Sequence, residues 1–344
     1  MPSTSQDTPT EQPQPFVLFE PDSTQQQDDN AGEDAGLWCP LDARGLLRVD
    51  GEDAEAFLQG QLSQDMARVR AGAVLLAAHC TPKGRVTALF RAWHDGEAFW
   101  LDCPAELEAA AQRRLAMYVL RSRVRIQADR AGWLRTGLCA GARLARLEAL
   151  TIALPETPGE KVRAGPHWVA RLAGTGARWL LLSPHDAGAL LRAELASRLG
   201  AADPAGWALA RLRAGEPEVL PETTEAFIPQ MLNLDELDGV SFRKGCYTGQ
   251  EIVARTHYLG RVKRRMLQFA WSGAGQPVPG AMLAIAPGTL GPGTVADAVA
   301  ATEVGSAQLV WALRTRDDGG EALAVTQVPA EAAATHADRA QPVP

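Results

Sequence analysis

Short strand-like segments alternate with single helix-like segments, and this alternation limits the fold more than any other feature of the sequence. The helix-like segments begin with acidic residues, at 52–58 and 105–119. No apolar run approaches the roughly 18–20 residues of a membrane span. The sequence therefore predicts an α+β sheet domain and excludes a membrane-spanning helix. The strand-like segments are 45–50, 74–78, 86–93, 98–103 and 124–127.

A second set of the same kind follows downstream. Residues 168–172 and 178–182 flank Gly174-Thr175-Gly176 and predict a hairpin. A helix is expected to begin near 183–186 and to end at Gly200, and 207–213 is expected to be a strand. Residues 271–328 are dense in Gly and Pro and predict a small β-barrel.

The two ends of the chain differ in composition from its middle. Residues 1–36 carry eight acidic groups and no Lys or Arg, so the net charge of −7 resides there and the remainder is close to +1. This acidic segment and the Ala-rich 329–344 have too little apolar surface to offset their ordering entropy, and we expect both to be disordered tails. No secretory signal is visible, which favours a cytoplasmic protein.

The five cysteines do not form a recognisable framework. Their number is odd and no pair has C-x-x-C spacing, which argues against disulfides or a stable metal site. We expect four of them to be small buried side chains, namely Cys39, Cys80, Cys103 and Cys139. The fifth, Cys246, has different neighbours.

The segment 239–260 carries the strongest functional signal. Thr248 and Glu251 have the spacing of a capping box, which predicts a helix start near Gly249. Cys246 then precedes the positive end of that helix, with Lys244 and another cation close by. These features favour thiolate over thiol, so Cys246 is a candidate reactive group.

Residues 241–265 contain seven basic side chains against one acid, Glu251. A solvated surface is one interpretation of this run, and an anionic ligand is another. A polyglutamylated cofactor, a phosphate or an RNA backbone would each match it. Tyr247 and Tyr258 are available to stack on a flat ring or to pack in the core, and Arg261 is a weaker candidate for an anion contact.

The run Lys244-Gly-Cys-Tyr-Thr-Gly-Gln-Glu251, followed by Arg255, resembles the K-G-C-Y-x-G-Q-E signature of the YgfZ proteins, folate-binding relatives of the glycine-cleavage T-protein. Further matches lie at 57–65, 81–85 and 227–230. The resemblance spans about residues 37–328.

This resemblance implies a three-domain aminomethyltransferase-like ring with two ferredoxin-like α+β units and a C-terminal barrel. The domains would be 37–130, folate-binding-like, 131–270, carrying the signature, and 271–328. It also implies tetrahydrofolate as cofactor and a link to iron–sulfur enzymes, tRNA-modifying ones among them. Cys246 would be the functional residue, with a task left open between one-carbon chemistry, transient cluster ligation and redox exchange. The implied cofactor-binding residues are Lys244, Gly245, Tyr247, Gly249, Gln250, Glu251 and Arg255.

The sequence departs from the T-protein pattern in one informative way. Aminomethyltransferases carry acidic residues shortly after the strand-opening glycine, whereas 84–90 contains none and Ala88 and Leu89 occupy the aligned positions. Ala214 also stands where relatives often have an acid. A folate-binding accessory protein is therefore the first hypothesis. A folate-dependent one-carbon transferase or demethylase is the second, and a nucleic-acid-binding module is the third.

Overall fold

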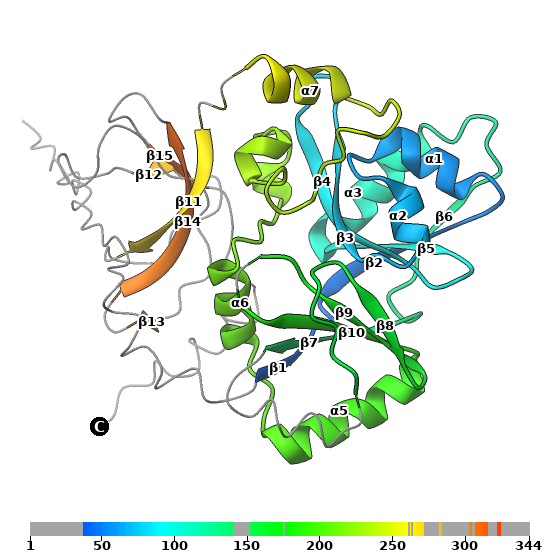
Figure 1. The fold of residues 1–344 in the computed structure, drawn as a ribbon, viewed down its shortest axis with the longest axis vertical. Coiled ribbons are helices and arrows are strands. Elements are labelled where there is room, and N and C mark those ends of the chain that lie inside the picture. Colours follow the sequence, from blue (N-terminus) through cyan, green and yellow to red (C-terminus); the bar gives the residue numbers. More distant parts are fainter. Residues whose placement is uncertain are drawn as a thin grey trace, which may run out of the picture.

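The computed structural model describes residues 37–139, 152–174, 176–260, 262 and 264–271, together with the strands 282–283, 303–304, 307–315 and 322–324. Three antiparallel sheets of five strands each are present in this part of the chain (Figure 1). None of the helices it contains is long and apolar enough to cross a membrane. The predicted tails 1–36 and 329–344 lie outside the described residues.

The first sheet carries three helices on one face. Its strand order is β3-β4-β5-β2-β6, and the strands predicted in this region are all present. Helix side chains such as Phe57 and Leu115 close a core against Leu47 and Leu101. The elements are β2 (Arg44–Asp50), α1 (Ala54–Gln61), α2 (Met66–Arg70), β3 (Leu75–Cys80), β4 (Val86–His94), β5 (Phe99–Pro104), α3 (Ala105–Ala116) and β6 (Arg125–Ala128).

The second sheet combines the start of the described chain with its middle. Its order is β1-β7-β10-β9-β8, so the first described strand pairs with β7 rather than with the first sheet. The predicted hairpin is confirmed as the antiparallel pair β9–β10, and the predicted helix is confirmed as α5. The elements are β1 (Leu37–Pro40), β7 (Leu134–Cys139), β8 (Lys161–Ala164), β9 (His167–Arg171), β10 (Arg178–Ser183) and α5 (His185–Leu199).

The predicted strand at 207–213 is wrong. This segment belongs to the helix α6 (Pro204–Arg213). Asp203 caps the helix, because its Oδ1 accepts a hydrogen bond from the Gly206 amide at 2.8 Å, and Pro204 occupies the first turn. The apolar run is typical of a strand, but the cap at Asp203, four residues before 207, decides in favour of a helix.

The third sheet lies in the region predicted as a β-barrel. Its strands follow the order β11-β14-β15-β12, with β13 beside β14, and the described strands do not close into a ring. Most of 271–328 lies outside the described residues, so the barrel stays a prediction. The strands are β11 (Arg264–Trp271), β12 (Met282–Leu283), β13 (Glu303–Val304), β14 (Ala307–Thr315) and β15 (Ala322–Ala324).

The other face of the first sheet is covered by the segment that follows α6. Phe227 and Val253 pack with Leu76, Cys80 and Leu89 in a separate apolar cluster. The main chain also joins the sheet, since the amide of Val86 donates to the carbonyl of Phe227 at 2.7 Å. The segment contains the short helices η3 (Pro221–Thr223) and η4 (Pro229–Leu232), then α7 (Gln250–Tyr258).

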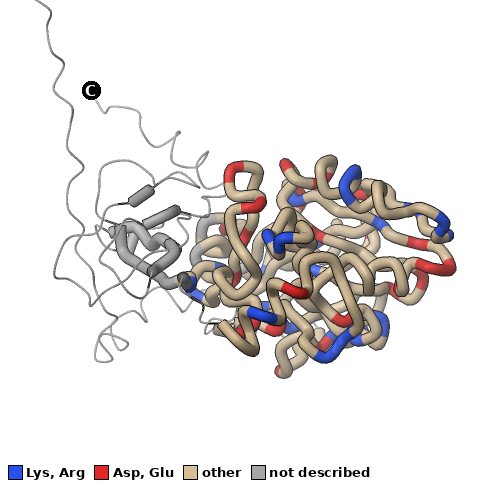
Figure 2. The backbone as a smooth tube through the Cα atoms, turned by 90° about the horizontal axis from the view of Figure 1, so that it is seen from above, with Lys and Arg blue, Asp and Glu red and all other residues tan. Residues whose placement is uncertain are grey.

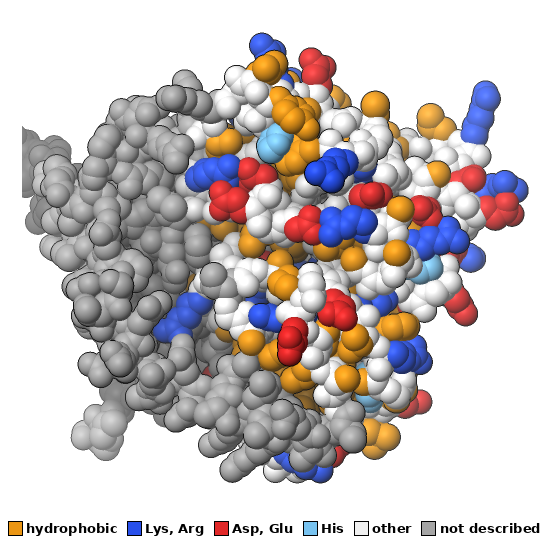
Figure 3. Space-filling model, in the orientation of Figure 1, with side chains coloured by type: hydrophobic (Ala, Val, Ile, Leu, Met, Phe, Trp, Pro, Cys, Tyr) orange, Lys and Arg blue, Asp and Glu red, His pale blue; other side chains and the backbone are white. Residues whose placement is uncertain are grey.

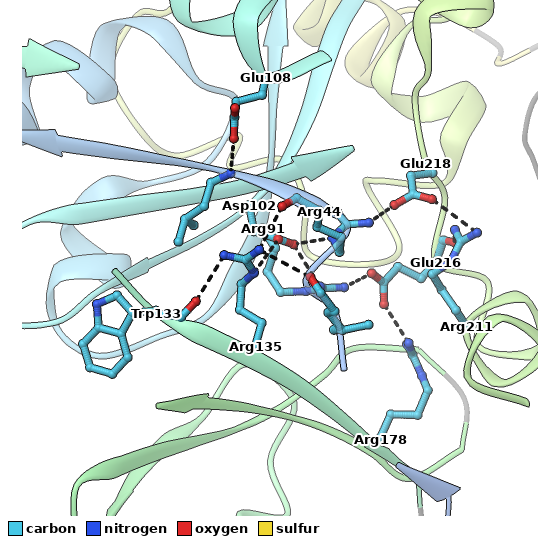
Figure 4. Close-up of polar contacts among 12 residues, drawn as sticks. Arg44, Arg91, Asp102, Glu108, Trp133, Arg135, Arg178, Arg211, Glu216 and Glu218 are labelled. Atoms are coloured by element: carbon cyan, nitrogen blue, oxygen red, sulfur yellow. Dashed lines mark hydrogen bonds and ion pairs between the residues drawn. The ribbon is translucent and has the colours of Figure 1, made fainter. Parts of the chain in front are cut away.

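A buried ionic cluster joins the first sheet, the second sheet and α6 (Figure 4). Glu216 accepts from Arg178 at 2.8 Å and also pairs with Arg91. Burial opposes the charge of Glu218, but Arg211 and Arg44 beside it lower its pKa to about 2. The members of this cluster are Arg44, Arg91, Asp102, Arg135, Arg178, Arg211, Glu216 and Glu218.

We expect Glu216→Gln to destabilise the chain by about 3–5 kcal/mol, because it leaves Arg91 and Arg178 buried without their shared carboxylate. Urea unfolding measures the change. The matched control is Glu194→Gln, which removes the exposed pair with Arg198 and should cost about 0.5 kcal/mol or less. Equal losses in the two variants would contradict this view of the cluster.

A second buried ionisable group lies at a bulge of the first sheet. Thr87 is the extra residue where the β3–β4 register shifts. Its hydroxyl donates to the carbonyl of His79 at 3.1 Å, so the His79 Nδ1–H donates to Thr87 Oγ1 at 2.7 Å and Nε2 has no partner among the described residues. Burial, with a smaller contribution from Arg114, lowers the pKa of His79 to about 4.

His79 should therefore make stability depend on pH. Below pH 6.5 the unfolded chain binds a proton that the folded chain does not, so the free energy of unfolding falls by up to about 3 kcal/mol as pH drops towards 4. His79→Gln should flatten this part of the profile in urea titrations at several pH values. His185→Gln, at an exposed position, should keep the wild-type slope. A wild-type slope in His79→Gln would refute the assignment.

Candidate functional site

Three segments that are far apart in the sequence meet at the N-terminus of α7. They are the signature loop before the helix, the end of α1 and the turn between β3 and β4. The turn lies directly against the helix start. A Cβ on Gly249 would stand 2.4 Å from the carbonyl oxygen of Thr81, and one on Gly84 would stand 2.9 Å from the Cβ of Ile252. Both glycines also have positive φ angles, +84° and +69°. Only glycine satisfies both conditions at these two positions.

Lys244 ties the signature loop to the helical layer of the first sheet. Its Nζ donates to the carbonyl oxygens of Leu62 at 2.6 Å and Gln64 at 2.8 Å, and it lies 5.1 Å from the centre of the Tyr247 ring. Burial lowers the pKa of Lys244 to about 8. Within the structure, this ammonium group therefore holds the loop against the link between α1 and α2.

Tyr247 is a core residue in the structure. Its side chain is buried, and burial raises its pKa. The amide of the next residue, Thr248, donates to the carbonyl of Gly60 at 3.3 Å. Of the two fates predicted for this tyrosine, packing in the interior is the one observed.

Sequence reasoning assigned no role to Ser63, although it belongs to the 57–65 motif. Its hydroxyl donates to the carbonyl of Gly239 at 2.7 Å and accepts from the amide of Ala78 at 2.8 Å. Gln230, in the 227–230 motif, donates to the carbonyl of Val253 at 2.7 Å. Gln230 is the one polar side chain of the 227–230 motif, which is a signal for its positioning role, whereas Ser63 stands among other polar residues and carries no such signal.

Cys246 differs from the other four cysteines in exposure. It is exposed, whereas Cys39, Cys80, Cys103 and Cys139 are buried. Burial raises the pKa of the Cys80 and Cys139 thiols to about 12. Solvent therefore reaches the thiol of Cys246 alone among the five, at the surface of a loop that its neighbours anchor on both sides.

The predicted capping box is wrong in detail, although the helix begins where expected. Gly249 is the N-cap residue, in a left-handed conformation, and no side chain caps the helix. The close approach to Thr81 imposes this conformation on Gly249, and a side-chain cap from Thr248 is not formed. Glu251 is exposed and Gln250 is half-buried.

The basic run divides into paired and unpaired side chains. Arg265 forms ion pairs with Asp235 and Glu236. Arg243 and Arg255 are exposed and have no carboxylate partner in the described part of the chain. Arg261 lies outside the described residues. Gly245 is exposed, and a Cβ there would meet no atom within 4 Å.

The junction between the two sheets provides the test for a folate ligand. Carboxylates, a guanidinium group and apolar walls line it, through Glu216, Asp238, Arg91 and Leu172 among others. Its cavity measures only about 40 Å³, whereas small-molecule sites usually offer about 300–1,000 Å³. The lining chemistry suits a pteridine ring, but the described cavity does not hold one.

The remaining sequence predictions concern acids and metals. Ala88, Leu89 and Ala214 are all buried alkyl side chains, so these positions offer no proton-transfer group. Groups of three or more His, Cys, Asp or Glu side chains that could hold a metal ion do not occur among the residues that the structure describes.

Comparison with known proteins identifies relatives in sequence and a neighbour in fold. No protein-family model matches it. It is 32% identical over 241 residues to a tRNA-modifying protein YgfZ of Shigella boydii, covering 70% of this chain and 73% of the relative. It is 33% identical over 231 residues to the protein of that name in Pectobacterium carotovorum, covering 67% and 69%. The fold resembles the glycine-cleavage aminomethyltransferase T of Bartonella henselae, with a TM-score of 0.55, 14% identity and 85% of each chain covered. The chain belongs to the YgfZ family.

Proposed function

We propose that this chain is a tetrahydrofolate-binding accessory protein for the synthesis or repair of iron–sulfur enzymes, tRNA-modifying ones among them, and that it acts in the cytoplasm through the thiol of Cys246. One observation carries the proposal: Cys246 is the exposed thiol among five, on a loop anchored by Lys244 and Tyr247. Relatives named tRNA-modifying proteins support the biological setting.

The alternative, a folate-dependent one-carbon transferase or demethylase, receives less support. The fold likeness to an aminomethyltransferase speaks for it. Proton transfer during C–N cleavage needs a positioned acid or base. The positions where the aminomethyltransferase pattern has acidic residues hold the buried Ala88 and Leu89 in this chain. An accessory role for the thiol makes no such demand.

Cys246→Ala should abolish function in cells that lack the native protein, measured as the activity of an iron–sulfur tRNA-modifying enzyme. Because Cys246 is exposed, the free energy of unfolding of the variant should lie within about 0.5 kcal/mol of the wild-type value. Cys80→Ala is the matched control: it should keep function while losing stability, since it empties a buried site. A Cys246→Ala variant that restores full activity would disprove the role of the thiol.

Tetrahydrofolate should bind to both the wild type and Cys246→Ala in calorimetry, because the proposal gives the exposed thiol a chemical step and no role in holding the ligand. Ala173→Trp should leave the affinity unchanged, because the junction cavity that it would fill is too small for a pteridine ring. Thermal unfolding checks that the variant folds. A tenfold loss of affinity in Ala173→Trp would place the folate site at the junction, and no binding by any variant would remove folate from the proposal.

A further inference from the structure

Three aromatic rings form a continuous cluster at the end of α7. The rings of Phe242 and His257 are stacked, with centroids 3.7 Å apart and planes inclined by 15°. Tyr258 meets both rings edge-on, with centroid distances of 6.2 Å and 4.7 Å. Phe242 belongs to the segment before α7, and His257 and Tyr258 belong to α7 itself. The cluster therefore joins the helix to the segment that precedes it.

The outer part of this cluster faces solvent. Tyr258 is 65% exposed and the adjoining Leu259 is 85% exposed, which is unusual for large apolar side chains. Phe242 is half-buried and His257 is exposed, so Phe242 lies beneath and His257 presents its ring outwards. In Figure 3, hydrophobic side chains and a histidine gather at the top of the molecule, over α7, with basic side chains on both sides and acidic side chains also close by.

Three cations without ion-pair partners in the described part of the chain lie on α7, on the segment before it and on the turn against its start. Arg243 adjoins Phe242, and Arg255 lies one helical turn before Tyr258. Lys83 occupies the β3–β4 turn that packs against the start of α7. All three are exposed, and none forms an ion pair within the described ranges. Elsewhere acidic and basic residues are interspersed along the described chain (Figure 2), and Glu251 is the one acid of the helix.

We propose that Phe242, His257 and Tyr258 form a binding platform for an unpaired segment of RNA, with Arg243 and Arg255 on the same two segments and Lys83 towards the start of α7. Bases stack on exposed aromatic rings regardless of sequence, while the cations neutralise the backbone phosphates. The inference rests on the proposed function and deepens it, because it gives the surface beside Cys246 a polyanionic ligand. RNA is favoured over a protein partner because the unpaired cations outnumber Glu251, the one acid of α7, and this positive excess matches a phosphate backbone.

The test is fluorescence anisotropy of a labelled tRNA anticodon stem–loop with the full chain at about 50 mM salt. Tyr258→Ala and His257→Ala should each weaken binding about 5- to 100-fold, the range expected from loss of one stacked base. Leu190→Ala is the matched control, because Leu190 is 75% exposed on α5, and it should bind like the wild type. A fully paired RNA duplex of equal length should bind more weakly than the loop.

The charged residues are tested by salt dependence. The double variant Arg243→Gln/Arg255→Gln should reduce the slope of log K against log salt by about 0.7 per lost phosphate contact. Arg113→Gln/Arg121→Gln removes two exposed, unpaired arginines near α3 and should leave the slope unchanged. Equal slopes for the two double variants would overturn the assignment of these cations.

Each remaining outcome has one meaning. No binding by the wild type, equal binding of loop and duplex, or equal affinity for Tyr258→Ala and Leu190→Ala would overturn the platform. Loss of an iron–sulfur enzyme from pull-downs with Tyr258→Ala, with RNA affinity unchanged, would assign the surface to a protein and also overturn it. Cys246→Ala should bind RNA like the wild type, so failure of the platform and failure of the proposed thiol function are distinguishable.

Discussion

The buried ionic cluster is the constraint on which the arrangement of the two sheets depends. Five arginines and three carboxylates meet where the first sheet, the second sheet and α6 come together. Burial lowers the pKa of Arg91 and Arg178 to about 10 and about 9, which shows how strongly the interior disfavours their charge. Such groups are tolerated only while every partner keeps its place. Displacing one sheet would expose or isolate several charges together, so the cluster fixes a single relative position.

That fixed position matters because the segment after α6 starts from the cluster. Glu216 and Glu218 anchor its beginning, and the chain then crosses the open face of the first sheet before it reaches Cys246. Phe227 and Val253 hold it there by apolar contact, and Lys244 holds the loop by hydrogen bonds. The thiol therefore stands on a support with both ends attached, which is how proteins position reactive groups.

Much of this arrangement could be predicted from the sequence, and the failures have identifiable physical causes. Strand and helix periods located the first sheet and the hairpin of the second, because those segments are long and bounded by turns. The 207–213 segment failed because a cap outside it, Asp203, determined its conformation. The capping box failed because a tertiary contact, Gly249 against Thr81, imposed the backbone geometry. The ionic cluster could not be predicted, since its members come from five strands, α6 and the loop after α6, and no local pattern encodes their contacts.

The site shows the same division between local and tertiary information. Cys246 was recognisable from its neighbours, and its exposure agrees with that interpretation. Lys244, in contrast, was predicted as a ligand contact, and its hydrogen bonds go to the main chain of Leu62 and Gln64. A motif residue next to the proposed reactive thiol can thus support the loop rather than touch a ligand. The residues left to meet a ligand are those that the fold does not engage, and near Cys246 these are the aromatic rings and cations at the surface of α7. Chemistry at the thiol and recognition beside it would then occupy one rigid surface, so that a bound partner and the reactive group keep a constant separation.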